Sequence, residues 1–226
     1  MAIVLSSVRI HQGTLPALNF VDDSPSVLIL DPGHGGVDGG ASSPAGNKES
    51  DINLAIVLKV ESLCAFLGVE TVLTRRDDVS IHDAGCKTIR EMKVSDLNNR
   101  VALIDNTPNA MLISVHQNTF TDPNCHGSQV FFGPSEGSAQ WGGYTQLLIQ
   151  QSVDSGNRRS ASAVPEHVYL FKHIDCPAIL VECGFLSNAT DTALLLTSGY
   201  QLKLAAVLTA AYFHQLQMIP NPVGGE

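Results

Sequence analysis

The sequence predicts a single α/β domain with a central, mostly parallel β-sheet and helices on both of its faces. Short apolar runs of strand length alternate with helical patterns of ten or more residues, which is typical of parallel sheets. The 226 residues suit one sizeable domain, and no linker or internal repeat divides them. A composition of 44% hydrophobic and 15% charged residues is that of a globular chain.

Six segments have the length and composition of β-strands. Each is an apolar or β-branched run bounded by glycine, proline or polar residues. The sixth, HVYLFKH, is a candidate for a short strand. They are SVLILD (26–31), VETVLTR (69–75), AMLISVH (110–116), CHGSQVFFG (125–133), PAILVECGF (177–185) and HVYLFKH (167–173).

Four segments have helical periodicity. In the first, apolar residues fall largely on one stripe and Gly68 marks the end. The stripe comprises Ile52, Ala55, Ile56, Leu63, Phe66 and Leu67. The helices are expected at 51–68, 94–106, 141–153 and 198–217. Residues 75–93 are polar and are interpreted as a loop long enough to form a lid.

The two ends of the chain are expected to lie outside the domain. Residues 1–25 are weakly patterned and are interpreted as a leader or N-terminal tail, residues 26–217 as the domain, and residues 218–226 as a C-terminal tail. No apolar run approaches the ~20 residues that a membrane helix needs. The opening MAIVLSSV lacks the basic start and small-residue cleavage pattern of a signal peptide.

Charge and cysteine usage narrow the class of protein. The formal net charge of −9 disfavours nucleic-acid binding, which would require a basic face, and leaves no polybasic membrane patch. The five cysteines form no C-x-x-C pair, so their spacing disfavours a cysteine zinc site. Cys64 lies in the first helical pattern as a small core residue, while a disulfide between Cys86 and Cys125 stays open.

Polar residues follow three of the predicted strands where each strand ends. SVLILD leads into Pro32, Gly33 and His34, AMLISV leads into His116, and PAILV leads into Glu182. If these strands are parallel neighbours, their side chains converge on one edge of the sheet. Glu49 joins them from the first turn of the helix after the glycine loop.

The glycine loop admits three interpretations. Nucleotide binding is disfavoured, because GHGGVDGG is not G-x-G-x-x-G opening a helix and no G-K-[ST] follows. A structural role is the ordinary explanation for a lone histidine. It weakens when His34, His116, Glu49 and Glu182 are expected at one edge. Two histidines and one glutamate are a known zinc-hydrolase ligand set, so the pattern favours a metal site.

Four ordered motifs resemble the zinc-dependent N-acetylmuramoyl-L-alanine amidases of the type 3 family, which cleave bacterial peptidoglycan. They are DPGHGGVDGG, ESDINLA, SVHQN and PAILVECGFLSN, and the resemblance spans roughly residues 26–216. It implies a single α/β domain in which His34, Glu49 and His116 bind zinc. It also implies that Glu182 is the catalytic carboxylate. The implied substrate is the amide between the lactyl group of muramic acid and L-alanine.

Two departures from the family pattern point to a subgroup. Ser50 stands where many members have a lysine, and VYLFKH stands where many have an arginine. With KVSDLNNRV, the latter looks most like the germination-specific members of the family. That resemblance implies an extracytoplasmic location in the wall or spore cortex, action on peptidoglycan and muramic δ-lactam formation. No appended wall-binding domain is evident, so targeting is expected to come from the groove, from a lost leader or from an accessory or tethering protein.

Several assignments stay open from the sequence alone. Lys172 is either a contact for the oxyanion or stem peptide or a surface lysine. Asp31 and Asn118 either orient ligands or substrate or make core hydrogen bonds. A zinc peptidase or other metal-dependent amidase, and a catalytically silent wall-binding module, are the competing functions. The presence of Glu182 beside the ligand set argues against the silent module.

Overall fold

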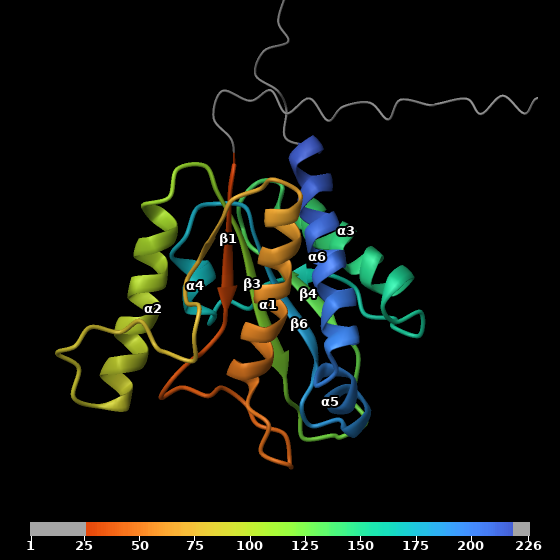
Figure 1. The fold of residues 1–226 in the computed structure, drawn as a ribbon, viewed down its shortest axis with the longest axis horizontal. Helices are drawn as coiled ribbons and strands as arrows, with labels where there is room; N and C mark the ends of the chain where they lie inside the picture. Colours follow the sequence, from red (N-terminus) through yellow and green to blue (C-terminus); the bar gives the residue numbers. More distant parts are fainter. Residues whose placement is uncertain (1–25, 219–226) are drawn as a thin grey trace, which may run out of the picture.

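The computed structural model describes residues 26–218. The expectations for 1–25 and for 219–226 concern parts of the chain outside the described residues. Six strands form one sheet in the order β2-β1-β3-β6-β4-β5. All neighbours are parallel except β4, which runs antiparallel to β6. The predicted fold class, a mostly parallel sheet with helices on both faces, is confirmed (Figure 1).

The strands that carry the site lie at the centre of the sheet. β1 (Val27–Pro32) is flanked by β2 (Thr71–Leu73) and β3 (Ala110–Asn118), and β3 pairs with β6 (Ala178–Phe185). The predicted parallel neighbours β1, β3 and β6 are therefore adjacent. On the far side of β6 lies β4 (Gln129–Phe132), within the strand predicted at 125–133. Beyond it lies the two-residue β5 (Ser162–Ala163), which was not predicted.

Alternate residues of the central strands supply two separate cores. One face, which includes Leu30, Ile113 and Val181, packs against α1, α3, α5 and α6. The other face, which includes Leu112 and Leu180, packs against α2 and α4. Because both faces are covered, these strands read as continuous apolar runs in the sequence.

The helices differ from the predictions mainly at their ends. The first face is covered by α1 (Glu49–Phe66), α3 (Ser138–Ser152), α5 (Ala189–Leu195) and α6 (Ser198–Met218), and the second by α2 (Ile89–Asp105) and α4 (Tyr169–Lys172). Figure 1 shows α2 and α4 together on one side of β1, with α1 and α6 grouped on the other. α5 was not predicted.

α1 shows that the predicted stripe was only partly right. Ile52 and Ile56 are buried as expected, but Phe66 is 86% exposed, and Cys64 takes the buried position in the last turn. Gly68 follows the helix with φ +79°, the left-handed conformation that ends helices and favours glycine. The prediction of Cys64 as a small core residue is confirmed.

Two predictions of local structure were wrong. HVYLFKH forms the single helical turn α4 rather than a strand, since Leu170 and Phe171 both turn into the second core. Residues 89–93 belong to α2 rather than to a loop. That helix begins early because Thr88 and Glu91 form a capping box, with each side chain accepting a hydrogen bond from the other's backbone N–H.

All five cysteines are free thiols, so Cys86 and Cys125 form no disulfide in this structure. Across residues 26–218, no single helix has the length and apolarity of a membrane span. The bent pair α5 and α6, with 81° between them, meets that test by length and composition alone.

Candidate functional site

The glycine loop after β1 holds His34 in a left-handed backbone conformation. Its φ is +62°, which residues with a side chain adopt rarely. Glycines around it make room for neighbouring side chains. A Cβ at Gly33 would lie 2.2 Å from Cε1 of His116, and one at Gly40 would lie 2.5 Å from Oε2 of Glu49. The glycines therefore let two polar side chains pack against the loop.

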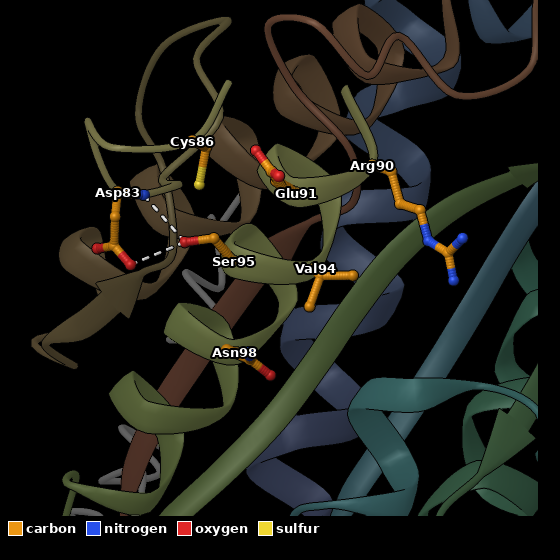
Figure 2. A pocket seen from close by; sticks show the side chains of 7 residues that line it. All are labelled: Asp83, Cys86, Arg90, Glu91, Val94, Ser95 and Asn98. Atoms are coloured by element: carbon orange, nitrogen blue, oxygen red, sulfur yellow. Dashed lines mark hydrogen bonds between the residues drawn. The ribbon is translucent and has the colours of Figure 1, made fainter. Parts of the chain in front are cut away.

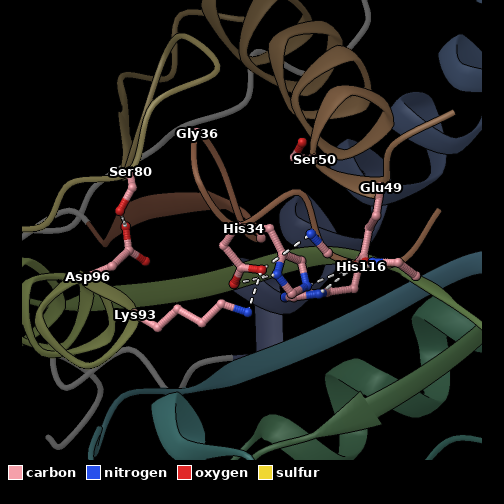
Figure 3. A network of polar contacts seen from close by, with 12 residues as sticks. His34, Gly36, Glu49, Ser50, Ser80, Lys93, Asp96 and His116 are labelled. Atoms are coloured by element: carbon pink, nitrogen blue, oxygen red, sulfur yellow. Dashed lines mark hydrogen bonds and ion pairs between the residues drawn. The ribbon is translucent and has the colours of Figure 1, made fainter. Parts of the chain in front are cut away.

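Glu49 lies between His34 and His116. Its Oε1 is 2.9 Å from Nδ1 of His116 and 3.3 Å from Nε2 of His34, and the two ring centroids are 5.0 Å apart (Figure 3). The donor atoms of the three residues all lie within 4.8 Å of one another, so they could hold one metal ion. The Glu49 side chain is 4% exposed but the imidazoles are 26% and 22% exposed, so the cluster opens toward solvent on the histidine side.

Backbone hydrogen bonds fix the Glu49 carboxylate. The N–H of Ala41 donates to Oε2 over 2.8 Å, and the N–H of Gln117 donates to Oε1 over 3.1 Å. Burial would raise the pKa of Glu49, but the hydrogen bonds from His116 and His34 outweigh it and hold that pKa well below its usual range. The carboxylate is therefore ionised at neutral pH.

Asn53, one turn along α1, ties Glu49 to both neighbouring strands. Its side-chain amide donates to the carbonyl of Gly33 over 3.1 Å and to Oε1 of Glu49 over 3.4 Å. Its own Oδ1 accepts a hydrogen bond from the side chain of Gln117 over 3.1 Å. The start of α1 is thereby held against the ends of β1 and β3.

Two buried arginines bind three successive carbonyls of the glycine loop. Arg100, from α2, donates to the carbonyl of His34 over 2.8 Å and to that of Pro32 over 3.1 Å. Arg75, just after β2, donates to the carbonyl of Pro32 over 2.9 Å and to that of Gly33 over 3.0 Å. The unusual path of the loop is therefore held by one side chain from α2 and one from the segment after β2.

Buried carboxylates balance the charge of Arg100. Its guanidinium pairs with Asp31 and donates to Oδ2 of Asp96 over 2.7 Å. Asp31 also accepts hydrogen bonds from Ser114 and Thr74, each over 2.7 Å. Burial would raise the pKa of Asp31, but Arg100 and the two hydroxyls lower it to about 2. Asp31 thus belongs to a core network, and it acts on the loop through Arg100.

Asp38 and Lys93 continue the network on the solvent side of His34. Oδ2 of Asp38 is 3.0 Å from Nδ1 of His34, and Oδ1 is 2.9 Å from Nζ of Lys93, which reaches in from α2 (Figure 3). Burial would lower the pKa of His34, but the hydrogen bonds with Asp38 and Glu49 raise it to about 9. Asp38 fixes the ring so that Nε2 faces Glu49.

Glu182 lies on β6 directly beside His116 of β3 in the parallel register. Its Oε2 is buried and has no hydrogen-bond partner among residues 26–218. Burial raises the pKa of this carboxyl to about 7, although the charge of His116 opposes the rise. A partly protonated carboxyl at neutral pH beside a possible metal cluster is suited to moving a proton.

The structure thus brings His34, Glu49, His116 and Glu182 to one edge of the sheet, and two further predicted residues make no described contact with the metal-ligand candidates. Lys172 is the exposed last residue of α4, and Asn118 at the end of β3 accepts a hydrogen bond from the N–H of Thr119 over 2.8 Å. Neither side chain makes a described contact with His34, Glu49 or His116. A substrate role for Lys172 and Asn118 stays a prediction.

Sequence reasoning missed four residues that support the site. Asp38 lies within the motif DPGHGGVDGG, and Lys93 and Arg100 lie within KVSDLNNRV. Both motifs were used for the family resemblance, but the contacts of these three side chains with the loop were not predicted. The i, i+4 pair of Asp96 and Arg100 on α2 was the available signal. Arg75 had no local signal, because its partners at the site, the carbonyls of Pro32, Gly33 and Ser50, lie 25 to 43 positions away in the chain.

A separate hollow of about 410 Å³ lies between the first turns of α2 and the segment before it (Figure 2). Ser95 links the two sides, since its hydroxyl accepts from the N–H of Asp83 over 3.0 Å and donates to Oδ2 of Asp83 over 2.9 Å. The segment predicted as a lid is thus hydrogen-bonded to α2. The lining residues are Asp83, Cys86, Arg90, Glu91, Val94, Ser95 and Asn98.

Fold and site together define a class of protein. Two imidazoles and one buried carboxylate with a solvent-facing side are the donor set of metal-assisted hydrolases, and the sheet carries them at its carboxyl edge, where α/β proteins form their sites. An adjacent carboxyl with a raised pKa fits that class.

Comparison with known proteins narrows the class to a family. Residues 28–212 match the model of the N-acetylmuramoyl-L-alanine amidase family, and the chain belongs to this family. The germination-specific N-acetylmuramoyl-L-alanine amidase of Bacillus subtilis is 31% identical over 186 residues, which are 81% of this chain and 76% of that protein. AmiA of Escherichia coli is 26% identical over 234 residues, covering 83% of this chain and 76% of that one.

Solved structures show the same similarity in three dimensions. The CwlD amidase from Clostridioides difficile, solved in complex with the GerS lipoprotein, superposes with a TM-score of 0.82 at 34% identity, covering 86% of this chain and 100% of that one. A second N-acetylmuramoyl-L-alanine amidase, from Clostridium difficile 630, shares the fold with a TM-score of 0.75 at 24% identity, covering 87% of this chain and 100% of that one. The predicted family and its germination-specific resemblance are confirmed.

Proposed function

We propose that this protein is a zinc-dependent N-acetylmuramoyl-L-alanine amidase. It hydrolyses the amide between the lactyl carbonyl of muramic acid and the amino group of L-alanine. The observation that carries the proposal is the juxtaposition, within the family's fold, of the His34–Glu49–His116 cluster and a buried carboxylate oxygen of Glu182 that has no hydrogen-bond partner among the described residues. The decisive experiment treats purified muropeptides with the protein and looks for released peptides that begin with a free L-alanine amino group.

The residues present fit zinc. His34, Glu49 and His116 offer two nitrogens and one carboxylate oxygen, three ligands that leave one position of a tetrahedral site open. Backbone N–H groups of Ala41 and Gln117 orient the Glu49 carboxylate, and Asp38 binds the other ring nitrogen of His34, as carboxylates beside metal-binding histidines do. Zinc, when bound, supplies polarisation of the carbonyl and a lowered pKa of water.

Glu182 moves the proton in this proposal. Its buried Oε2 is free to accept a proton from the attacking water and then to donate it to the leaving nitrogen of L-alanine. A pKa near 7 lets one carboxyl perform both steps at neutral pH. The apolar run before it on β6 keeps the carboxyl dry, which is the cause of the raised pKa.

Glu182→Gln tests this role. The variant should keep its zinc, because Glu182 is not among the three ligands, and lose turnover by about 10² or more, the scale of general acid–base catalysis. Turnover is measured on muropeptides and zinc by elemental analysis. Turnover equal to that of the parent would show that Glu182 is not the base. Loss of zinc together with turnover would instead place it among the ligands.

We further propose that the substrate is spore cortex, and that the protein acts outside the cytoplasm with an accessory partner. Similarity to the germination-specific amidase supports the substrate, and the lipoprotein bound to the similar CwlD amidase supports the partner. Removal of the stem peptide would free the lactyl carboxylate for closure to muramic δ-lactam. Mass spectrometry of spore muropeptides from a strain lacking the protein tests this, and normal lactam levels would reject the cortex role.

A further inference from the structure

Beyond the His34–Glu49–His116 cluster, further polar side chains lie along the carboxyl edge of the sheet, on β6 and then on β4. β4 runs antiparallel to β6, so its first residue, Gln129, lies at this same edge and pairs directly with Glu182. Side chains of paired residues point to the same face of an antiparallel pair. With strands about 4.8 Å apart, Gln129 lies one strand beyond Glu182, on the side away from His116.

Arg159 is fixed at this position by three contacts. Its Nη1 donates to Oε1 of Gln129 over 3.0 Å, and its Nε donates to the carbonyl of His126 over 3.0 Å. Its guanidinium carbon lies 4.7 Å from the centre of the Phe185 ring, near the end of β6. A guanidinium held by two hydrogen bonds and an aromatic face has lost most of its freedom and is pre-organised to bind an anion.

The other terminal nitrogen of the Arg159 guanidinium, Nη2, is left to bind a ligand. Nη2 makes no hydrogen bond with any residue in the described range 26–218, and no aspartate or glutamate of that range forms an ion pair with Arg159. The side chain is half-buried. An unpaired, rigid cation is notable in a chain whose net charge is −9.

The direction of the substrate follows from the proposed function, on which this inference rests. The carbonyl lies at His34, Glu49 and His116, and the leaving nitrogen lies at Glu182. The peptide therefore continues past β6 toward β4. One residue spans about 3.5 Å, so the residue after L-alanine arrives at the neighbouring strand. We propose that Arg159 binds a carboxylate on that part of the stem peptide and makes the enzyme selective for acidic peptides.

Two muropeptides test the proposal, differing only in a carboxylate or a carboxamide on the residue after L-alanine. The parent should prefer the carboxylate form. Arg159→Gln should lower kcat/KM on that form by about ten- to a hundred-fold, the range for a charge-assisted hydrogen bond, mainly through KM. Its kcat/KM on the carboxamide form should stay close to that of the parent, so the preference disappears. Arg159→Lys, which keeps the charge without the planar fork, should retain part of it.

Arg158→Gln is the matched control, because Arg158 is exposed and, among residues 26–218, its side chain donates only to the carbonyls of Ser155 and Asn157. It should leave the preference unchanged. Equal cleavage of both muropeptides by the parent would overturn the proposal, and so would an equal loss on both by Arg159→Gln, which indicates a structural role. In either case the amidase assignment survives. A parent that releases no L-alanine peptide from either would overturn the proposed function and this inference together.

Discussion

Replacement of Arg100 by methionine should destabilise the fold through the glycine loop. Arg100 is 2% exposed, and its guanidinium pairs with Asp31 and Asp96 while binding the carbonyls of Pro32 and His34. Methionine is unbranched and uncharged, so it replaces the aliphatic stem of Arg100 but not the guanidinium, and it removes every one of these interactions. Asp31 then stays buried with only hydroxyl partners.

The size of the effect can be worked out from the contacts. Burial raises the pKa of Asp31, but Arg100 and the hydroxyls of Ser114 and Thr74 lower it from 3.8 to about 2. The net stabilisation is about 2 kcal/mol at roughly 1.4 kcal/mol per tenfold change in proton affinity, and Arg100 is the largest of the stabilising partners. Two loop carbonyls also lose a charged donor, at about 1–3 kcal/mol each when buried. Because such contributions overlap, we expect Arg100→Met to lower the free energy of unfolding by about 3–5 kcal/mol, the usual cost of breaking a buried ion pair.

Urea unfolding of the metal-free full chain measures this cost, with Arg90→Met as control, because Arg90 is an exposed arginine on the same helix. The pH dependence gives a second check. The depressed pKa of Asp31 means that the pair stabilises the parent above pH 3.8 and that this stability is lost as the pH falls toward 2. The difference in the free energy of unfolding between the parent and Arg100→Met should therefore become smaller as the pH falls from 3.8 to about 2. A cost below about 1 kcal/mol, or a difference that does not become smaller, would refute the reasoning.

The remaining predictions concern the metal cluster. Elemental analysis after reconstitution should find roughly one zinc per parent chain and much less in His34→Ala and in His116→Ala; full retention by both variants would reject the ligand assignment. Gly33→Ala should lower the zinc content, and it should lower the free energy of unfolding by about 1–3 kcal/mol, because the new Cβ would lie 2.2 Å from Cε1 of His116. Gly143→Ala is the control, since a Cβ there meets no neighbouring atom within 4 Å. Equal behaviour of the two variants would count against close packing of His116 on Gly33. In metal-free Asp38→Asn, an NMR titration should find the pKa of His34 lowered from about 9 toward 6.5, and an unchanged value would remove Asp38 from its supporting role.

How far the site was predictable depends on the range of the interactions. His34, His116 and Glu182 were placed correctly because a buried parallel strand is a local pattern and its carboxyl end has a known location. Glu49 followed from the start of the helix. The contacts of Arg75 and Arg100 were out of reach, since they join residues that are 43 and 68 positions apart in the chain.

The wrong local assignments have a physical cause as well. YLFK has the apolar, aromatic composition of a strand, yet it forms one turn of helix because Leu170 and Phe171 must both enter the same core. The early start of α2 was readable, since T-I-R-E is a capping box, but the polar composition of the preceding loop hid it. Tertiary packing decided the first case and an overlooked local signal the second.

The positions of the two arginines in the chain also decide when the supports of the glycine loop are made during synthesis. The loop and Glu49 emerge first, Arg75 and Arg100 follow, and His116 comes last. A nascent chain therefore has both loop supports before its third donor is made. A fragment that ends within α2 would carry two of the three donors without β3, the strand that pairs with β1. The donor set of His34, Glu49 and His116 is thus complete only after β3, which pairs with β1 at the centre of the sheet, has been made.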